Sequence, residues 1–132
     1  MMIISGLLIT GGWGSDDEIL SSTELWSPGL ESSPATCTLP NMARPRSSHS
    51  LSGGLACGGD GFVDSCEVFT SGGWELLDSR LSVERWDHSA WLQPTTNTTF
   101  LIGGGTSSDR SVDTVTTTGR VARPDLTLKH DV

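Results

Sequence analysis

The sequence repeats one short pattern three times, a mostly apolar run that ends in a pair of glycines. These runs cover residues 7–12, 54–59 and 100–104, and their second glycines lie 47 and 45 residues apart. Self-similarity at such a period is typical of proteins in which a supersecondary unit is repeated and each unit buries its apolar face against the next. The chain is therefore expected to be a short array of units. The six glycines are Gly11, Gly12, Gly58, Gly59, Gly103 and Gly104.

Two other landmarks keep step with the glycine pairs. An Arg-x-x-His-Ser signature precedes the second and third pairs, and the two copies lie 39 residues apart. A short segment that contains a glutamate and ends in an aromatic residue follows the first and second pairs, at 23–26 and 66–69. The order of landmarks is the same each time, which supports a true repeat. The signature residues are Arg46, His49, Arg85 and His88, and the aromatic residues are Trp26 and Phe69.

The repeat divides the whole chain, 1–132, into three units at about 1–40, 45–78 and 84–130. In the central unit the pattern predicts four short strands near 48–52, 54–58, 65–69 and 73–77, the first two joined by a tight Gly-Gly hairpin. No helix is expected. The fold class is therefore all-β.

The glycine pairs have a physical reason. A residue without a Cβ can adopt positive φ and lets neighbouring backbone approach closely. Alanine at Gly58 or Gly59 is therefore expected to be costly.

These residues resemble kelch repeats, and the resemblance covers nearly the whole chain. It is carried by the glycine pairs, the two signatures, Trp26, Phe69 and Trp74. It departs in the first unit, where Cys37 stands near the family's tryptophan, and in the third, which ends without one. The sequence around the cysteines is similar to that of a cysteine-containing kelch subgroup of extracellular invertebrate proteins.

The resemblance implies a β-propeller fragment built of two to three four-stranded antiparallel blades. Propellers close with about 4 to 8 blades, so this ring is not closed. Repeat arrays need about three units to be stable, and marginal stability, self-association or blades supplied from elsewhere are expected.

Two cysteines are predicted to pair. Cys57 ends the second strand of the central unit and Cys66 begins the third. Opposed Cα atoms of antiparallel strands lie about 4.5–5.5 Å apart, within the range that a disulfide tolerates. An oxidising compartment would give a Cys57–Cys66 disulfide, and the alternative is two buried thiols in a cytosolic protein. Cys37 would then be left for a partner in a missing blade.

Charge and hydropathy limit the partners. Lysine and arginine number 8 against 16 acidic residues, and the net charge of -8 disfavours nucleic acid. No run reaches the roughly 18 apolar residues that span a bilayer. The run at 1–10 has no basic n-region and indicates a strand rather than a signal sequence. A glycosylation sequon stands at Asn97. We expect an extracellular or secreted protein, with a cytoplasmic one as the alternative.

No catalytic residue, metal or cofactor is expected. His49 and His88 occupy the same place in two units, which favours imidazoles packed and hydrogen-bonded within their own blade. The chain lacks the G-x-S-x-G and S-x-x-K motifs of serine nucleophiles. It also contains no tyrosine, which excludes the copper chemistry of galactose oxidase, a kelch propeller that coordinates its metal through tyrosines.

The segments after the glycine pairs are the candidate binding surface, because loops at one rim of a propeller usually carry the contacts. We therefore expect a non-enzymatic protein- or glycan-binding module. The alternatives are an intracellular kelch adaptor, serving a ubiquitin ligase or the cytoskeleton, and scaffold blades of a larger kelch-fold enzyme. The candidate ligand-facing residues are Trp13, Asp16, Asp17, Asp60, Phe62, Asp109 and Arg110.

Overall fold

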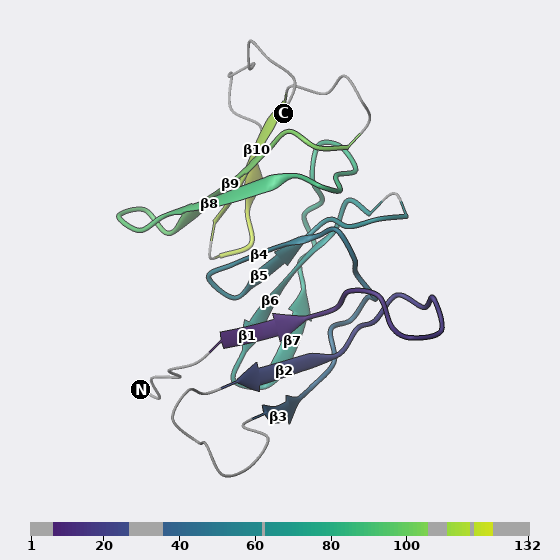
Figure 1. Ribbon diagram of the computed structural model, residues 1–132. Coiled ribbons are helices and arrows are strands. Elements are labelled where there is room, and N and C mark those ends of the chain that lie inside the picture. Colours follow the sequence, from purple (N-terminus) through teal and green to yellow (C-terminus); the bar gives the residue numbers. More distant parts are fainter. Residues whose placement is uncertain (1–6, 27–35, 62, 106–110, 117, 123–132) are drawn as a thin grey trace.

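A computed structural model of the chain describes residues 7–26, 36–61, 63–105, 111–116 and 118–122 (Figure 1). These residues form strands and loops without any helix, so the prediction of an all-β chain is confirmed. No helix that could cross a membrane occurs in this part of the chain.

The strands form three separate antiparallel sheets that do not close into a barrel. Neighbouring strands in each sheet follow one another along the chain. The first sheet contains β1 (Leu7–Thr10), β2 (Thr23–Trp26) and β3 (Thr36–Leu39). The second contains β4 (Ser50–Ser52), β5 (Leu55–Cys57), β6 (Cys66–Thr70) and β7 (Gly73–Leu76). The third contains β8 (Ser89–Gln93), β9 (Thr98–Ile102), β10 (Val112–Thr116) and β11 (Val121–Ala122).

The four strands of the second sheet lie where the sequence predicts them, within about two residues at each end. Its first hairpin turns through Gly53 and Gly54, whose φ angles are +58° and +77°. Two consecutive residues with positive φ are the requirement of the type I′ turn, which matches the twist of the flanking strands. The Gly-Gly hairpin signal is therefore confirmed.

The register makes the sheets correspond strand by strand. The last residues of β1, β5 and β9 each stand opposite the first residue of the next strand, as Thr10↔Thr23, Cys57↔Cys66 and Ile102↔Val112. A glycine follows each of β1, β5 and β9. By this correspondence β4 and β8 have no counterpart among the described strands of the first sheet.

The main apolar core lies between the second and third sheets. Leu55 and Cys57 of β5 pack in one cluster with Leu101 of β9 and Val115 of β10. Leu101 is fully buried and Val115 is 1% exposed. The second and third sheets thus bury apolar side chains against each other, as expected of stacked repeat units.

Candidate functional site

The paired glycines all adopt positive φ. In the pair that follows β5 the angles are +69° at Gly58 and +134° at Gly59. A Cβ added at Gly58 would overlap the carbonyl oxygen of Arg85 and lie 2.8 Å from Cε1 of His88. We call the segments 40–49 and 77–88, which lead from one sheet to the next, connectors. The glycines therefore allow a connector to approach closely, as the sequence predicts.

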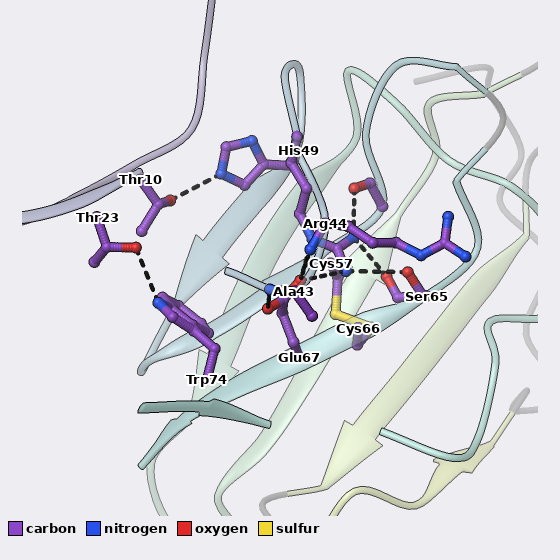
Figure 2. A network of polar contacts seen from close by, with 12 residues as sticks. Thr10, Thr23, Ala43, Arg44, His49, Cys57, Ser65, Cys66, Glu67 and Trp74 are labelled. Carbon is purple, nitrogen blue, oxygen red and sulfur yellow. Dashed lines mark hydrogen bonds and ion pairs between the residues drawn. A yellow bond between two sulfur atoms is a disulfide. The ribbon is translucent and has the colours of Figure 1, made fainter. Parts of the chain in front are cut away.

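The arginine of the first signature, Arg46, is fully buried in a polar network, and Figure 2 shows its partners Ser65 and Glu67 from close by. Arg46 donates to Oε2 of Glu67 from Nε at 3.1 Å and from Nη2 at 2.9 Å, and both side chains are fully buried. It also donates to the carbonyl oxygens of Gly58 at 2.8 Å and Ser65 at 2.9 Å, and to Oγ of Ser65 at 3.0 Å. Every acceptor belongs to the second sheet or its loop, so one guanidinium joins the ends of β5 and β6.

Glu67 also fixes the chain that leads into its sheet. Its two carboxylate oxygens accept the backbone N–H groups of Ala43 at 2.6 Å and Arg44 at 3.2 Å. A carboxylate with this many donors is well compensated for its burial.

The third sheet repeats the arrangement. Arg85 donates to Oδ2 of Asp113 from Nε at 3.2 Å and from Nη2 at 3.1 Å. It also donates to the carbonyl oxygens of Gly103 at 2.7 Å and Ser111 at 3.2 Å, and to Oγ of Ser111 at 2.6 Å. Ser82 donates to the same Asp113 oxygen. Glu67 and Asp113 are not among the residues predicted from the sequence, although Glu67 stands inside one of the repeated landmarks.

The two histidines contact the preceding sheet, so the prediction that they bond within their own blade is wrong. His49 Nε2 lies 2.9 Å from Oγ1 of Thr10 in the first sheet (Figure 2). His88 Nε2 lies 2.8 Å from Oγ of Ser50 in the second. The reason is the path of the connector, which runs against the sheet before it.

The backbone shows the same path. Gly12 N–H donates to the carbonyl oxygen of Arg46 at 2.7 Å, and Gly59 N–H donates to that of Arg85, also at 2.7 Å. In each connector the arginine side chain therefore bonds to the sheet that follows. The carbonyl oxygen of the same arginine and the histidine side chain bond to the sheet that precedes.

Burial lowers the pKa of both histidines, and the neighbouring arginines lower it further. The pKa of His88 falls to about 4. The imidazoles are therefore uncharged at neutral pH, consistent with a packing role.

The low pKa of His88 predicts a pH dependence of stability. Between about pH 6.5 and about pH 4 the unfolded chain binds a proton at His88 that the folded chain does not. The free energy of unfolding should therefore fall as pH falls through this window, by on the order of 2–3 kcal/mol from this residue. Urea unfolding at pH 7.5, 5.5 and 4.5 measures it. The variant His88→Gln has no titrating group at position 88, so its free energy of unfolding should depend less on pH. Equal pH dependence for the variant and the wild type would contradict this role of His88.

The predicted disulfide is present. Cys57 and Cys66 are bonded, their Cα atoms lie 4.2 Å apart, and both residues are fully buried. They are directly opposed in the register of β5 and β6. Cys37 belongs to β3, but its side chain lies outside the described residues.

One aromatic residue of the second sheet, Trp74, contacts the first sheet. Phe69 and Trp74 lie opposite one another in β6 and β7, with ring centroids 5.2 Å apart. Trp74 Nε1 donates to Oγ1 of Thr23 in the first sheet at 2.9 Å (Figure 2). Trp26, at the position of Phe69, is 42% exposed.

The loops after β1 and β5 extend toward the same side of the structure, at the right in Figure 1. Trp13 is 56% exposed, and Asp16, Asp17 and Asp60 are also exposed. Asn97 is exposed in the β8–β9 hairpin, which points the opposite way. Three of the candidate ligand-facing residues lie outside the described residues: Phe62, Asp109 and Arg110.

Within the described ranges no three histidine, cysteine or acidic side chains come together as a metal site would require. The polar networks instead join strands and sheets.

A scan against protein-family models and a search of curated proteins find no match to this chain.

Proposed function

We propose that the chain is a kelch-type β-propeller segment that binds a protein or a glycan through its rim loops and catalyses no reaction. Three observations support this assignment. The antiparallel sheets correspond in register. The glycine pairs adopt positive φ. A connector arginine is buried in each of the two four-stranded sheets.

The exposed side chain of Trp13 is the main support for a binding role. Its indole is exposed, yet its loop is held in shape by a β-bridge to Ile19 and by hydrogen bonds from Gly14 N–H to Glu18 O and from Leu20 N–H to Gly12 O, both 2.8 Å. An exposed aromatic ring on a fixed loop offers apolar contact area at little cost in conformational entropy. Asp16 and Asp17 add hydrogen-bond acceptors in the same loop.

We assign the protein to an oxidising compartment, outside the cell, because disulfides persist there and are rare in the cytosol. Asn97 suits this assignment. A glycan on the β8–β9 hairpin would extend away from the loops that follow β1 and β5 (Figure 1), so it would leave the binding side open.

The test is the substitution Trp13→Ala, assayed against a panel of glycans and extracellular protein fragments. Loss of a central tryptophan contact typically lowers affinity by about 30-fold, and we expect a loss of this size for any ligand that the panel identifies. Trp91→Ala is the matched control, since Trp91 is similarly exposed at 54% but lies in β8. Equal binding by both variants and the wild type would contradict the rim assignment.

A further inference from the structure

The first sheet contains residues equivalent to those that bind an arginine side chain in the second and third sheets. In the second and third sheets the guanidinium bonds to three kinds of residue: the glycine after the second strand, the serine before the third strand, and an acid one residue into that strand. The second sheet uses Gly58, Ser65 and Glu67, and the third uses Gly103, Ser111 and Asp113.

The register identifies the same three residues in the first sheet as Gly11, Ser22 and Glu24. Glu24 stands opposite Ile9, as Glu67 stands opposite Ala56. The backbone between the strands is also built alike, since Gly11 N–H donates to Ser22 O at 2.9 Å and Gly58 N–H donates to Ser65 O at 3.0 Å. The residues that supply the carbonyl, hydroxyl and carboxylate acceptors therefore occupy the same register positions as in the sheets that hold an arginine.

The two kinds of sheet differ in what covers these acceptors. Glu67 and Asp113 are fully buried, whereas Glu24 is exposed and forms no ion pair with any described residue. The outer edge of β1 is also unpaired within the described chain, whereas β5 pairs with β4 and β9 with β8. Ile9 is 45% exposed, while Leu101 at the corresponding position of the third sheet is fully buried. An anionic acceptor set and an apolar strand edge thus lie open together.

We propose that Gly11, Ser22 and Glu24 form a binding site for an arginine side chain on an extended polypeptide segment, which adds to the edge of β1 as the fourth strand of the first sheet. Main-chain hydrogen bonds to an open sheet edge supply affinity, and side-chain contacts supply specificity. The spacing is set by the other sheets: Arg46 and Arg85 each stand four residues before the first residue of β4 and of β8. The ligand is therefore an arginine followed, four residues later, by a β-strand.

A second folded copy of these residues does not provide this ligand, because its Arg46 and Arg85 are buried in their own sheets. The segment comes from polypeptide outside the described residues. Gly11 and Ser22 are the first and last residues of the loop that carries Trp13, but the site uses the base of that loop and Glu24 of β2 rather than the indole. Trp13→Ala and Glu24→Gln therefore test the two proposals independently.

A synthetic peptide with the sequence of residues 43–52 is the probe, titrated into the intact chain by isothermal calorimetry. It contains two arginines, Arg44 and Arg46, and only the second has the required spacing. Truncating one partner of a desolvated charge pair typically lowers affinity by about 30-fold or more, so the R46Q peptide should bind at least that much more weakly. The R44Q peptide has the same charge as the R46Q peptide, but it keeps Arg46 and should bind like the parent peptide.

The matched change in the protein is Glu24→Gln, which should lower affinity for the parent peptide by about 30-fold. Glu75→Gln removes the same charge from an exposed position on β7 and should have no effect. Hydrogen exchange should show new protection of the β1 amides when the peptide is bound. Absence of binding at millimolar peptide, or equal losses for R44Q and R46Q or for Glu24→Gln and Glu75→Gln, would overturn the proposal.

Discussion

Replacing Arg46 with methionine is expected to lower the free energy of unfolding by about 4 kcal/mol. The substitution removes five hydrogen bonds from the guanidinium and leaves the Glu67 carboxylate buried without its countercharge. Breaking a buried ion pair from one side typically costs about 3–5 kcal/mol. Urea unfolding, followed by tryptophan fluorescence at neutral pH, measures the change.

Arg80→Met is the control for this prediction. Arg80 donates to Asp64 at 2.6 Å, a shorter contact than any that the Arg46 guanidinium makes, but its side chain is 59% exposed. Surface pairs contribute about 0–1 kcal/mol, so this variant should unfold almost as the wild type does. The double variant Arg46→Met, Glu67→Met should recover much of the lost stability, because it removes the uncompensated charge. Equal costs for Arg46→Met and Arg80→Met would refute the structural role of the buried network.

Gly58→Ala is expected to destabilise the chain by roughly 3 kcal/mol or more. Positive φ costs a non-glycine residue about 1–2 kcal/mol, and the new methyl group adds its overlap with the Arg85 carbonyl oxygen. Overpacking of this kind typically costs about 1–3 kcal/mol. Thermal unfolding of the variant should show a clearly lower Tm.

Gly61→Ala separates the conformational cost of positive φ from the cost of the methyl overlap. Gly61 has φ +92°, but a Cβ there meets nothing within 4 Å. This variant should therefore show only the conformational cost of about 1–2 kcal/mol. If both alanines lowered stability equally, the close approach at Gly58 would contribute nothing and the reason given for the glycine pair would be wrong.

The features that sequence reasoning found are those with a local cause. The hairpin at Gly53 and Gly54 follows from two residues that tolerate positive φ between apolar segments. The disulfide follows from the placement of Cys57 and Cys66 at the facing ends of two strands joined by a short loop. In both cases the information lies within about ten residues of sequence.

The features that it missed depend on distant parts of the chain. Arg46 and Glu67 lie 21 residues apart, and Arg85 and Asp113 lie 28 apart. Neither spacing is a period of a strand or a helix. The direction of His49 was also missed, because its partner Thr10 is 39 residues away in another sheet. Only the path of the connector decides which sheet the imidazole meets.

Glu24 shows the limit most clearly. It occupies the same place in the repeat as Glu67, with the same residue type, and a sequence pattern treats the two alike. In the structure Glu67 is fully buried and Glu24 is exposed. The difference comes from a neighbouring strand and its arginine, which are present in one sheet and not among the described residues of the other.

The division of each connector between two sheets has a consequence for how such an array changes over time. A unit brings the arginine that organises its own sheet, and it brings the carbonyl and the histidine that attach it to the sheet before. The preceding unit supplies a glycine N–H and a hydroxyl each time, so both junctions join the same kinds of groups. Duplicating or deleting a whole unit therefore creates a junction of the same composition as those already there, and needs no compensating mutation elsewhere. A deletion that removes the arginine but keeps its acid, or the reverse, would instead leave one buried charge without its partner. Gene rearrangements in whole units should thus be tolerated, whereas those out of phase with the units should not.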